Sequence, residues 1–138
     1  MLVEHARELA GVADAAHAEY GHGGTPVISL LSCSLVATEI DIDIVPGTRL
    51  ASIHGSLRST EPTNCNYGLA PDFDHLATSG GLIVSARDDT GEVRAVERAD
   101  HPFYLATLYQ PQRRSTPESP HPVLTAFIGA ALEAHATA

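Results

Sequence analysis

The sequence predicts a single domain that mixes helices and strands, of the α/β or the α+β class. Two observations lead to this prediction. Apolar residues recur at helical spacing at both ends of the chain, and between them strand-forming segments alternate with turns that contain Pro or Gly. The length of 138 residues allows one domain at most, and a hydrophobic content of 43% suits a globular core.

Three segments are predicted to be helical. Residues 2–11 place their apolar side chains on one face, and Gly11 marks the end of the helix. Residues 71–80 have Pro at the start and Gly at the end, which is the usual order for a helix. Residues 120–135 again show apolar residues at helical spacing, so we expect an amphipathic helix at the end of the chain.

Most of the remaining chain is predicted to form strands, which are 27–45, 48–55, 81–88, 92–99 and 102–109. Residues 39–45 alternate strictly between acidic and apolar side chains, so one face of that strand should be wet. Pro46-Gly47 and Asp89-Thr90-Gly91 each indicate a hairpin turn. Residues 58–71 are loaded with polar side chains and are predicted to be a loop or a short strand.

The charge balance excludes several functions. The net charge is −9, with 17 acidic residues against 8 basic ones, and every basic residue is Arg. Such a chain lacks the clustered positive face that nucleic acids require, so no nucleic-acid partner is expected. A Schiff-base lysine and a Walker-type phosphate lysine are likewise missing from it. There is no apolar run of membrane-spanning length and no signal-peptide layout, so we expect a cytoplasmic protein without a membrane partner.

Cysteine and histidine give no metal or cofactor signal. Cys33 and Cys65 are far apart and are expected to be free thiols, too few for a structural zinc site. The eight histidines show neither HxH nor HExxH spacing, and most are expected to be ordinary surface or loop residues. We therefore expect no metal and no cofactor.

The segment "HPFYLATLYQPQ", followed by a Ser/Pro-rich loop, His-Pro and an amphipathic helix, resembles the C-terminal end of CTP synthase, within its class I glutamine amidotransferase domain. That family's pattern runs HPF-x-x-x-x-Q-F-H-P-E. "CNYGLAP" is similar to the family's H-R-Y-x-x-N segment, and "LVEHARELAGVADAAHAEY" to the helix and loop after its nucleophile elbow. The likeness covers nearly the whole chain, which also resembles the CTP synthase C-terminal region-related proteins.

The resemblance implies a class I glutamine amidotransferase-like (flavodoxin-like) half-domain over residues 1–138, with a mixed sheet and flanking helices. The N-terminal strands and the nucleophile elbow are absent from this sequence. A sheet cut in this way exposes strand edges and apolar surface. We therefore expect a second protein chain that supplies the N-terminal half, or self-association that hides the same surface. Met1 opens a plausible helix, which favours a gene product over a proteolytic piece; a cloned fragment stays open.

The departures from the family pattern carry the functional information. The family's general base and the residue that orients it fall on Gln110 and Gln112. A primary amide cannot take up a proton near neutral pH or hold an imidazolium. The Arg that grips the glutamine carboxylate falls on Asn66, and neither cysteine matches the nucleophile. Glutamine hydrolysis is therefore not expected.

The family's carboxylate for the amino group of glutamine falls on Glu19, which is either an ordinary surface residue or the remnant of an amine pocket. We expect an amine substrate, with Glu19 or His17 as the catalytic residue beside it. The predicted substrate-binding residues are Asn64, Cys65, Asn66, Tyr67, Gln110, Gln112, Arg113 and Arg114. Arg58, Arg113 or Arg114 would take an anion, although each has the alternative of a solvated surface charge.

Three functions remain open from the sequence. The first is a subunit of a heteromeric enzyme, with a layout similar to the two-chain aziridine synthases of natural-product pathways. There an amine attacks a carbon in the same molecule and displaces an anion such as sulfate. The second is a catalytically dead scaffold or regulatory subunit. The third is a thiol-dependent activity at Cys65, with His54 as a base.

Overall fold

Six strands form one mixed sheet within residues 1–21 and 23–137, which are the residues that this computed structural model describes. In chain order the elements are α1 (Leu2–Glu8), β1 (Ala15–His17), the 3₁₀ helix η1 (Ala18–Tyr20), β2 (Thr25–Ile44), α2 (Arg49–His54), β3 (Arg58–Leu69), the 3₁₀ helix η2 (Pro71–Thr78), β4 (Leu82–Asp88), β5 (Val93–Arg98), β6 (Leu105–Thr107), the 3₁₀ helix η3 (Pro111–Arg114) and α3 (Pro122–Ala136).

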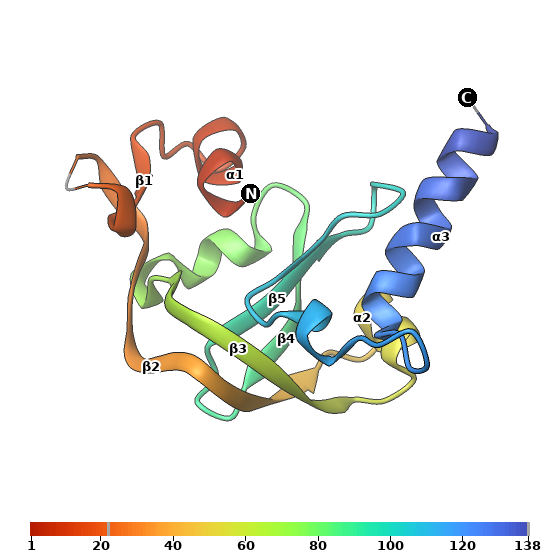
Figure 1. The fold of residues 1–138 in the computed structure, drawn as a ribbon. Helices are drawn as coiled ribbons and strands as arrows, with labels where there is room; N and C mark the ends of the chain where they lie inside the picture. The colour runs from red at the N-terminus through yellow and green to blue at the C-terminus, as the bar shows by residue number, and fades with distance from the viewer. Residues whose placement is uncertain (22, 138) are drawn as a thin grey trace.

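The long strand β2 organises the sheet. This strand of 20 residues pairs with three others. Its beginning pairs in parallel with β1, most of its length pairs antiparallel with β3, and residues 42–44 pair antiparallel with β4. β5 and β6 extend the sheet beyond β4, so the order is β1-β2-β4-β5-β6 with β3 attached to β2. Figure 1 shows β2 and β3 side by side along one edge of the molecule, with α1 beyond one end of the sheet and α3 beyond the other.

The clearest strand predictions are confirmed. The side chains of Ile42 and Ile44 are buried while those of Asp41 and Asp43 are exposed, as strict alternation requires. The turn at 89–91 joins β4 to β5 in an antiparallel pair. The helices predicted at the two ends of the chain are also present, as α1 and α3.

The prediction that residues 48–55 form a strand is wrong, because this segment forms α2. The hydroxyl of Thr48 accepts a hydrogen bond from Ala51 N at 3.1 Å and caps the first turn. The carboxylate of Glu97, on β5, accepts hydrogen bonds from Arg49 N at 2.7 Å and Leu50 N at 3.1 Å. Gly55 ends the helix in the left-handed conformation, at a φ of 65°.

Three other segments differ in kind or extent from the prediction. Residues 71–80 contain a 3₁₀ helix, η2, instead of an α-helix. The polar segment 58–71 contains the long strand β3, because it pairs with β2 over most of its length. The predicted buried strand 102–109 shrinks to the three partly buried residues of β6.

α3 packs against the rest of the molecule mainly through its first turn. Val123 is buried, whereas Phe127, Ile128 and Leu132 are 54%, 58% and 65% exposed. Figure 1 shows the helix running away from the sheet, with its beginning near α2. The predicted apolar face of this helix is therefore largely uncovered in the described structure. None of the helices in residues 1–21 and 23–137 has the length and apolar character needed to cross a bilayer.

Candidate functional site

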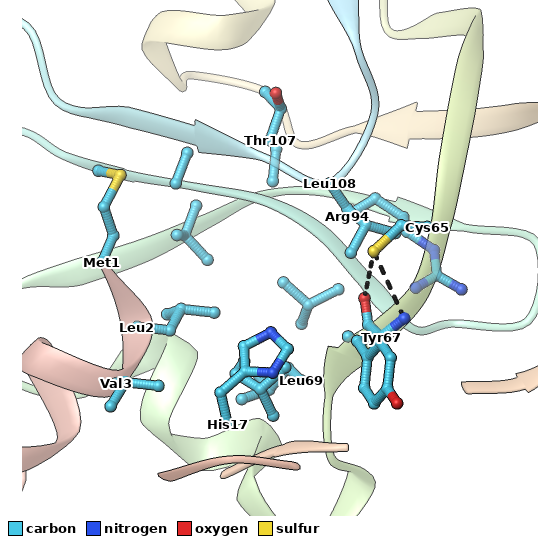
Figure 2. Close-up of a pocket in the computed structure, with 16 residues that line it drawn as sticks. Met1, Leu2, Val3, His17, Cys65, Tyr67, Leu69, Arg94, Thr107 and Leu108 are labelled. Atoms are coloured by element: carbon cyan, nitrogen blue, oxygen red, sulfur yellow. Dashed lines mark hydrogen bonds between the residues drawn. The ribbon is translucent and has the colours of Figure 1, made fainter. Parts of the chain in front are cut away.

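A solvent-open hollow of about 360 Å³ lies between α1, the end of β3 and strands β5 and β6. We call it the His17 hollow, after the histidine that projects into it in Figure 2. Its polar side chains are those of His17, Cys65, Tyr67, Arg94 and Thr107, and most of the remaining wall is apolar. A mostly apolar concavity with a few polar groups is the usual form of a small-molecule site.

His17 is held by its own backbone turn and by two aromatic rings. Its Nδ1 accepts a hydrogen bond from Glu19 N at 3.2 Å, so Nε2 carries the proton when the ring is neutral. The centre of the ring lies 4.9 Å from that of Tyr20 and 5.3 Å from that of Tyr67. Glu19 follows in η1 with an exposed side chain, and it is not among the residues that line the hollow.

β3 divides its predicted site residues between two faces. Cys65 and Tyr67 face the His17 hollow. Asn64 and Asn66 alternate to the other face, where the amide oxygen of Asn66 accepts from Ser34 Oγ at 2.7 Å. The amide oxygen of Asn64 accepts from the backbone of β2 at 3.1 Å. Both asparagines thus bind β2 and point away from the hollow.

The thiol of Cys65 forms hydrogen bonds with the backbone of its own strand. The thiol donates to Tyr67 O at 3.1 Å and accepts from Tyr67 N at 3.4 Å. His54, its candidate base, instead packs against His121, with ring centres 5.5 Å apart. His54 is therefore not placed to act as a base for the Cys65 thiol. The histidine that lines the same hollow as Cys65 is His17.

The predicted residues 110–114 lie on or beside η3, outside the His17 hollow. Gln110 is partly buried, and its N–H donates to Pro62 O at 2.8 Å. Gln112 is exposed. The guanidinium of Arg113 lies 3.5 Å from Thr63 O, and that of Arg114 donates to the carbonyl of residue 60. η3 is thus attached to β3 at residues 60–63, while the hollow lies farther along the strand.

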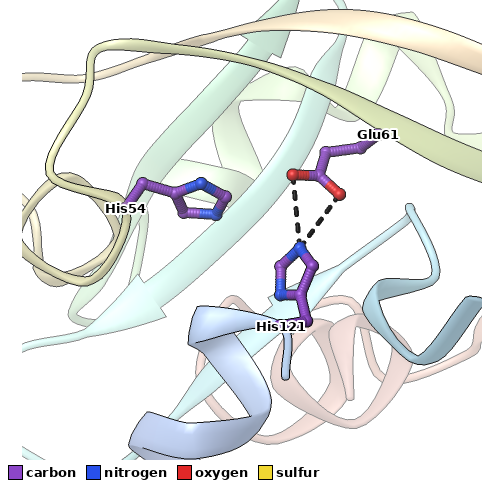
Figure 3. A group of neighbouring side chains, drawn as sticks. All are labelled: His54, Glu61 and His121. Atoms are coloured by element: carbon purple, nitrogen blue, oxygen red, sulfur yellow. Dashed lines mark hydrogen bonds and ion pairs between the residues drawn. The ribbon is translucent and has the colours of Figure 1, made fainter. Parts of the chain in front are cut away.

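A second polar group was not predicted from the sequence. His54 from α2, Glu61 from β3 and His121 at the N-cap of α3 place one ligand-type atom each within 4.8 Å of one another (Figure 3). We call these three residues the Glu61 cluster. They come from three separate elements, so no local spacing in the sequence could reveal them.

Burial sets the protonation of His54 in this cluster. Burial lowers the pKa of the His54 imidazole, the nearby Glu61 carboxylate acts in the opposite sense, and His121 lowers it further. The net shift is downward from 6.5, so His54 is neutral at pH 7. Ser59 Oγ donates to Glu61 Oε1 at 2.7 Å and helps to hold the carboxylate in place.

The chain was compared with known proteins. No model of a known protein family matches it. CTP synthase of Azospirillum brasilense is 30% identical over 96% of this chain, and that of Caldivirga maquilingensis is 34% identical over 95%. The glutaminase domain of Trypanosoma brucei CTPS with bound acivicin superposes with a TM-score of 0.87 at 26% identity, over 96% of this chain. The chain is related to the CTP synthase glutaminase domain.

The relationship is partial in extent. This glutaminase-related chain spans 28% and 26% of the lengths of the two CTP synthases and 56% of the solved glutaminase domain. Its mixed sheet with flanking helices has the class I glutamine amidotransferase (flavodoxin-like) fold, as the resemblance implied. Residues 110 and 112 of this chain are both Gln.

Proposed function

We propose that this chain is a non-glutaminase subunit of a heteromeric amidotransferase-like enzyme. The best-supported reaction is closure of a small nitrogen ring of the aziridine type, in natural-product biosynthesis. The observation that carries the proposal is the presence of Gln110 and Gln112 in a glutaminase-related fold. Any cysteine supplied by other sequence would find no base at these two positions, because an amide cannot act as a general base near neutral pH.

The surroundings of His17 favour an amine as the substrate group. An ammonium is attracted to the faces of aromatic rings and to a nearby carboxylate. Tyr20 and Tyr67 provide rings whose centres lie 4.9 and 5.3 Å from that of His17, and Glu19 belongs to the turn that follows His17.

The proposed reaction needs one base and no added reagent. Glu19 or His17 takes a proton from the ammonium, and the nitrogen lone pair forms the new N–C bond. The bond from that carbon to the leaving oxygen breaks, and sulfate departs with the electron pair. Holding the chain bent so that nitrogen and carbon meet can supply several kcal/mol of the acceleration.

The arginines of η3 lie too far along β3 to receive that sulfate. Arg113 and Arg114 contact the carbonyls of residues 63 and 60, and Tyr67 is four residues beyond Thr63, about 13 Å at the rise of a strand. In an aziridine-forming substrate, the amine and the leaving group are on neighbouring carbons. Arg58 already lies 3.5 Å from both Asp41 and Asp43. We therefore assign the donors for the departing anion to the partner chain.

The uncovered face of α3 supports the need for a partner. Phe127, Ile128 and Leu132 each expose more than half of their surface on one helix. Apolar patches of this kind are usually covered by another chain. The solved glutaminase domain extends well beyond the part matched here, so the proposed partner supplies the N-terminal half of the domain.

The experiment is a turnover assay on the complex of this chain with its co-purified partner. A β-amino alkyl sulfate is the substrate, and free sulfate and the loss of sulfuric acid from the substrate mass are measured. We expect release by the complex, at least tenfold less with Glu19→Gln or His17→Gln, and no change with Glu39→Gln, which alters another exposed carboxylate.

Two results would count against the proposal in different ways. Full sulfate release by both the Glu19 and the His17 variants would contradict the amine site. An intact complex that releases no sulfate would contradict ring closure and favour the scaffold or regulatory role instead.

A further inference from the structure

We propose that His54, Glu61 and His121 form a binding site for a divalent transition metal ion of the zinc type. The site goes beyond the proposed ring closure and does not depend on it, because the Glu61 cluster and the His17 hollow share no lining residue.

The geometry of the cluster suits one ion. Two imidazoles and one carboxylate place ligand-type atoms within 4.8 Å of one another, and Figure 3 shows the three side chains converging on a common space. Pairs of ligand atoms in a tetrahedral zinc site lie closer than this, since each is about 2 Å from the metal. Small side-chain movements therefore suffice to bring all three onto one ion.

One ring nitrogen of His54 is available to bind a ligand. Its Nε2 is buried and forms no hydrogen bond with any described residue. A buried polar atom without a partner is costly, and metal binding would satisfy it.

His121 must change its tautomer to take part. Nδ1 accepts a hydrogen bond from Val123 N at 3.2 Å, and Nε2 lies 3.1 Å from Glu61 Oε2. In the metal-free protein, Nε2–H therefore donates to the carboxylate. Binding through Nε2 moves that proton to Nδ1, so Nδ1 can no longer accept the hydrogen bond from Val123 N.

The ligand set and the opening next to it identify the class of ion. Two nitrogen ligands and one carboxylate oxygen match zinc sites that keep a fourth position open, whereas calcium and magnesium prefer oxygen ligands alone. A solvent-open hollow of about 240 Å³ reaches the cluster and is also lined by Ser59, Arg114 and Ser119. Arg114 is the positive group beside the site, so the fourth ligand would be water or an anion.

The test uses the full chain, stripped with a chelator and titrated with Zn²⁺ by calorimetry near pH 7.5. We expect saturation at one Zn²⁺ per chain, and affinity at least tenfold lower for His54→Gln. His54 makes no hydrogen bond through Nε2, so this variant should fold. His75→Gln, at an exposed histidine in η2, is the control and should bind as the unaltered chain does.

A second measurement needs no variant. Co²⁺ bound to two imidazoles and a carboxylate in a four-coordinate site gives an intense visible absorption, and Zn²⁺ should displace it. Absence of saturable Zn²⁺ binding, or equal binding by His54→Gln and His75→Gln, would overturn the proposal. An octahedral Co²⁺ spectrum that Zn²⁺ does not alter would overturn it as well.

Discussion

Nε2 of His121 lies 3.1 Å from the carboxylate of Glu61, across 60 residues of sequence and with both side chains almost fully buried. This contact attaches the N-cap of α3 to β3. Because the same ring caps Val123 N through Nδ1, one side chain both starts the helix and positions it.

The first prediction concerns this contact in metal-free buffer. His121→Ala leaves the Glu61 carboxylate buried with only the Ser59 hydroxyl as a partner and removes the cap of α3. We expect the free energy of unfolding to fall by about 2–4 kcal/mol. Urea unfolding followed by circular dichroism measures this, with His135→Ala as control, since His135 is exposed in the last turn of α3. Equal effects of the two substitutions would show that the contact contributes little.

The second prediction concerns acid stability. Burial alone would raise the pKa of Asp88, but hydrogen bonds from Thr90 and Arg94 outweigh burial and hold it below its ordinary value of 3.8. A carboxylate with a lowered folded-state pKa adds stability above 3.8, and that stability is lost as the pH falls through the folded-state pKa. Asp88→Asn should therefore lower stability at pH 7 and flatten its decline below pH 3.8.

Urea unfolding at a series of pH values down to about 2.5 measures this dependence. Asp89→Asn changes the neighbouring exposed carboxylate and serves as the control. An unchanged acid slope in Asp88→Asn would show that another group controls acid unfolding.

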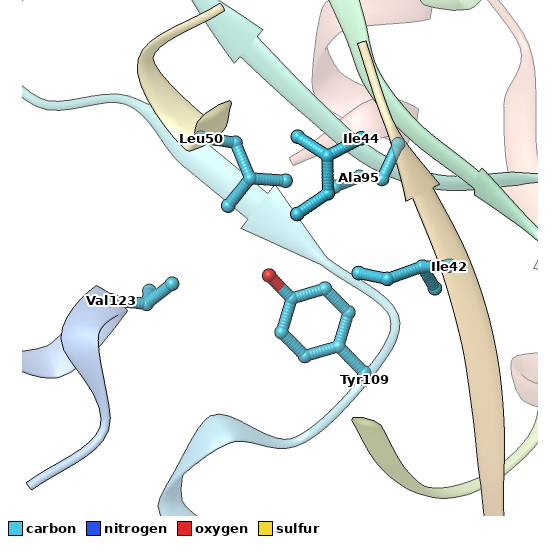
Figure 4. Packing of buried hydrophobic residues seen from close by; sticks show 7 residues of the cluster. Ile42, Ile44, Leu50, Ala95, Tyr109 and Val123 are labelled. Atoms are coloured by element: carbon cyan, nitrogen blue, oxygen red, sulfur yellow. The ribbon is translucent and has the colours of Figure 1, made fainter. Parts of the chain in front are cut away.

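The third prediction concerns Tyr109, which is 2% exposed and lies among the apolar residues of the main core cluster (Figure 4). Its hydroxyl has no hydrogen-bond partner among the described residues, and burial raises its pKa. Tyr109→Phe removes that hydroxyl and should leave the free energy of unfolding unchanged or raise it by up to about 1 kcal/mol. Tyr109→Ala should cost about 3–5 kcal/mol, because it leaves a cavity in the core. A large loss in Tyr109→Phe would reveal a partner for the hydroxyl, such as a buried water.

The fourth prediction concerns the exposed face of α3. Ile128→Glu with Leu132→Glu places two charges on the proposed interface and should weaken partner binding at least about tenfold. The stability of the isolated chain should hardly change, since both side chains are already more than half exposed. Glu133→Lys changes an exposed position about 100° or more around the helix from Phe127, Ile128 and Leu132, and is the matched control. Analytical size exclusion of the mixture distinguishes these cases.

Much of the fold could be predicted because it depends on local sequence patterns. The alternation at 39–45 and the turn at 89–91 are such patterns, and the structure confirms both. Residues 48–55 were assigned to the wrong element because the carboxylate that caps α2 comes from Glu97, more than forty residues away. A contact between distant segments leaves no trace in the spacing of neighbouring residues.

The candidate site also has features that could be predicted from the sequence and features that could not. The resemblance led to His17, Cys65 and Tyr67, and the structure places all three in one hollow. It could not show that Asn64 and Asn66 turn to the other face of β3, because the alternation of side chains matters only once that segment is known to be a strand. The Glu61 cluster escaped notice for a related reason, since its members meet only in the folded chain.

The measurement that tests the central claim most directly is an ammonia assay with free glutamine, on this chain alone and on its complex with the proposed partner. The amides at 110 and 112 predict no release above that of buffer in either sample, with Gln112→Ala giving the same zero rate. Ammonia produced in proportion to the amount of chain, and abolished by a substitution at Gln110 or Gln112, would contradict the account.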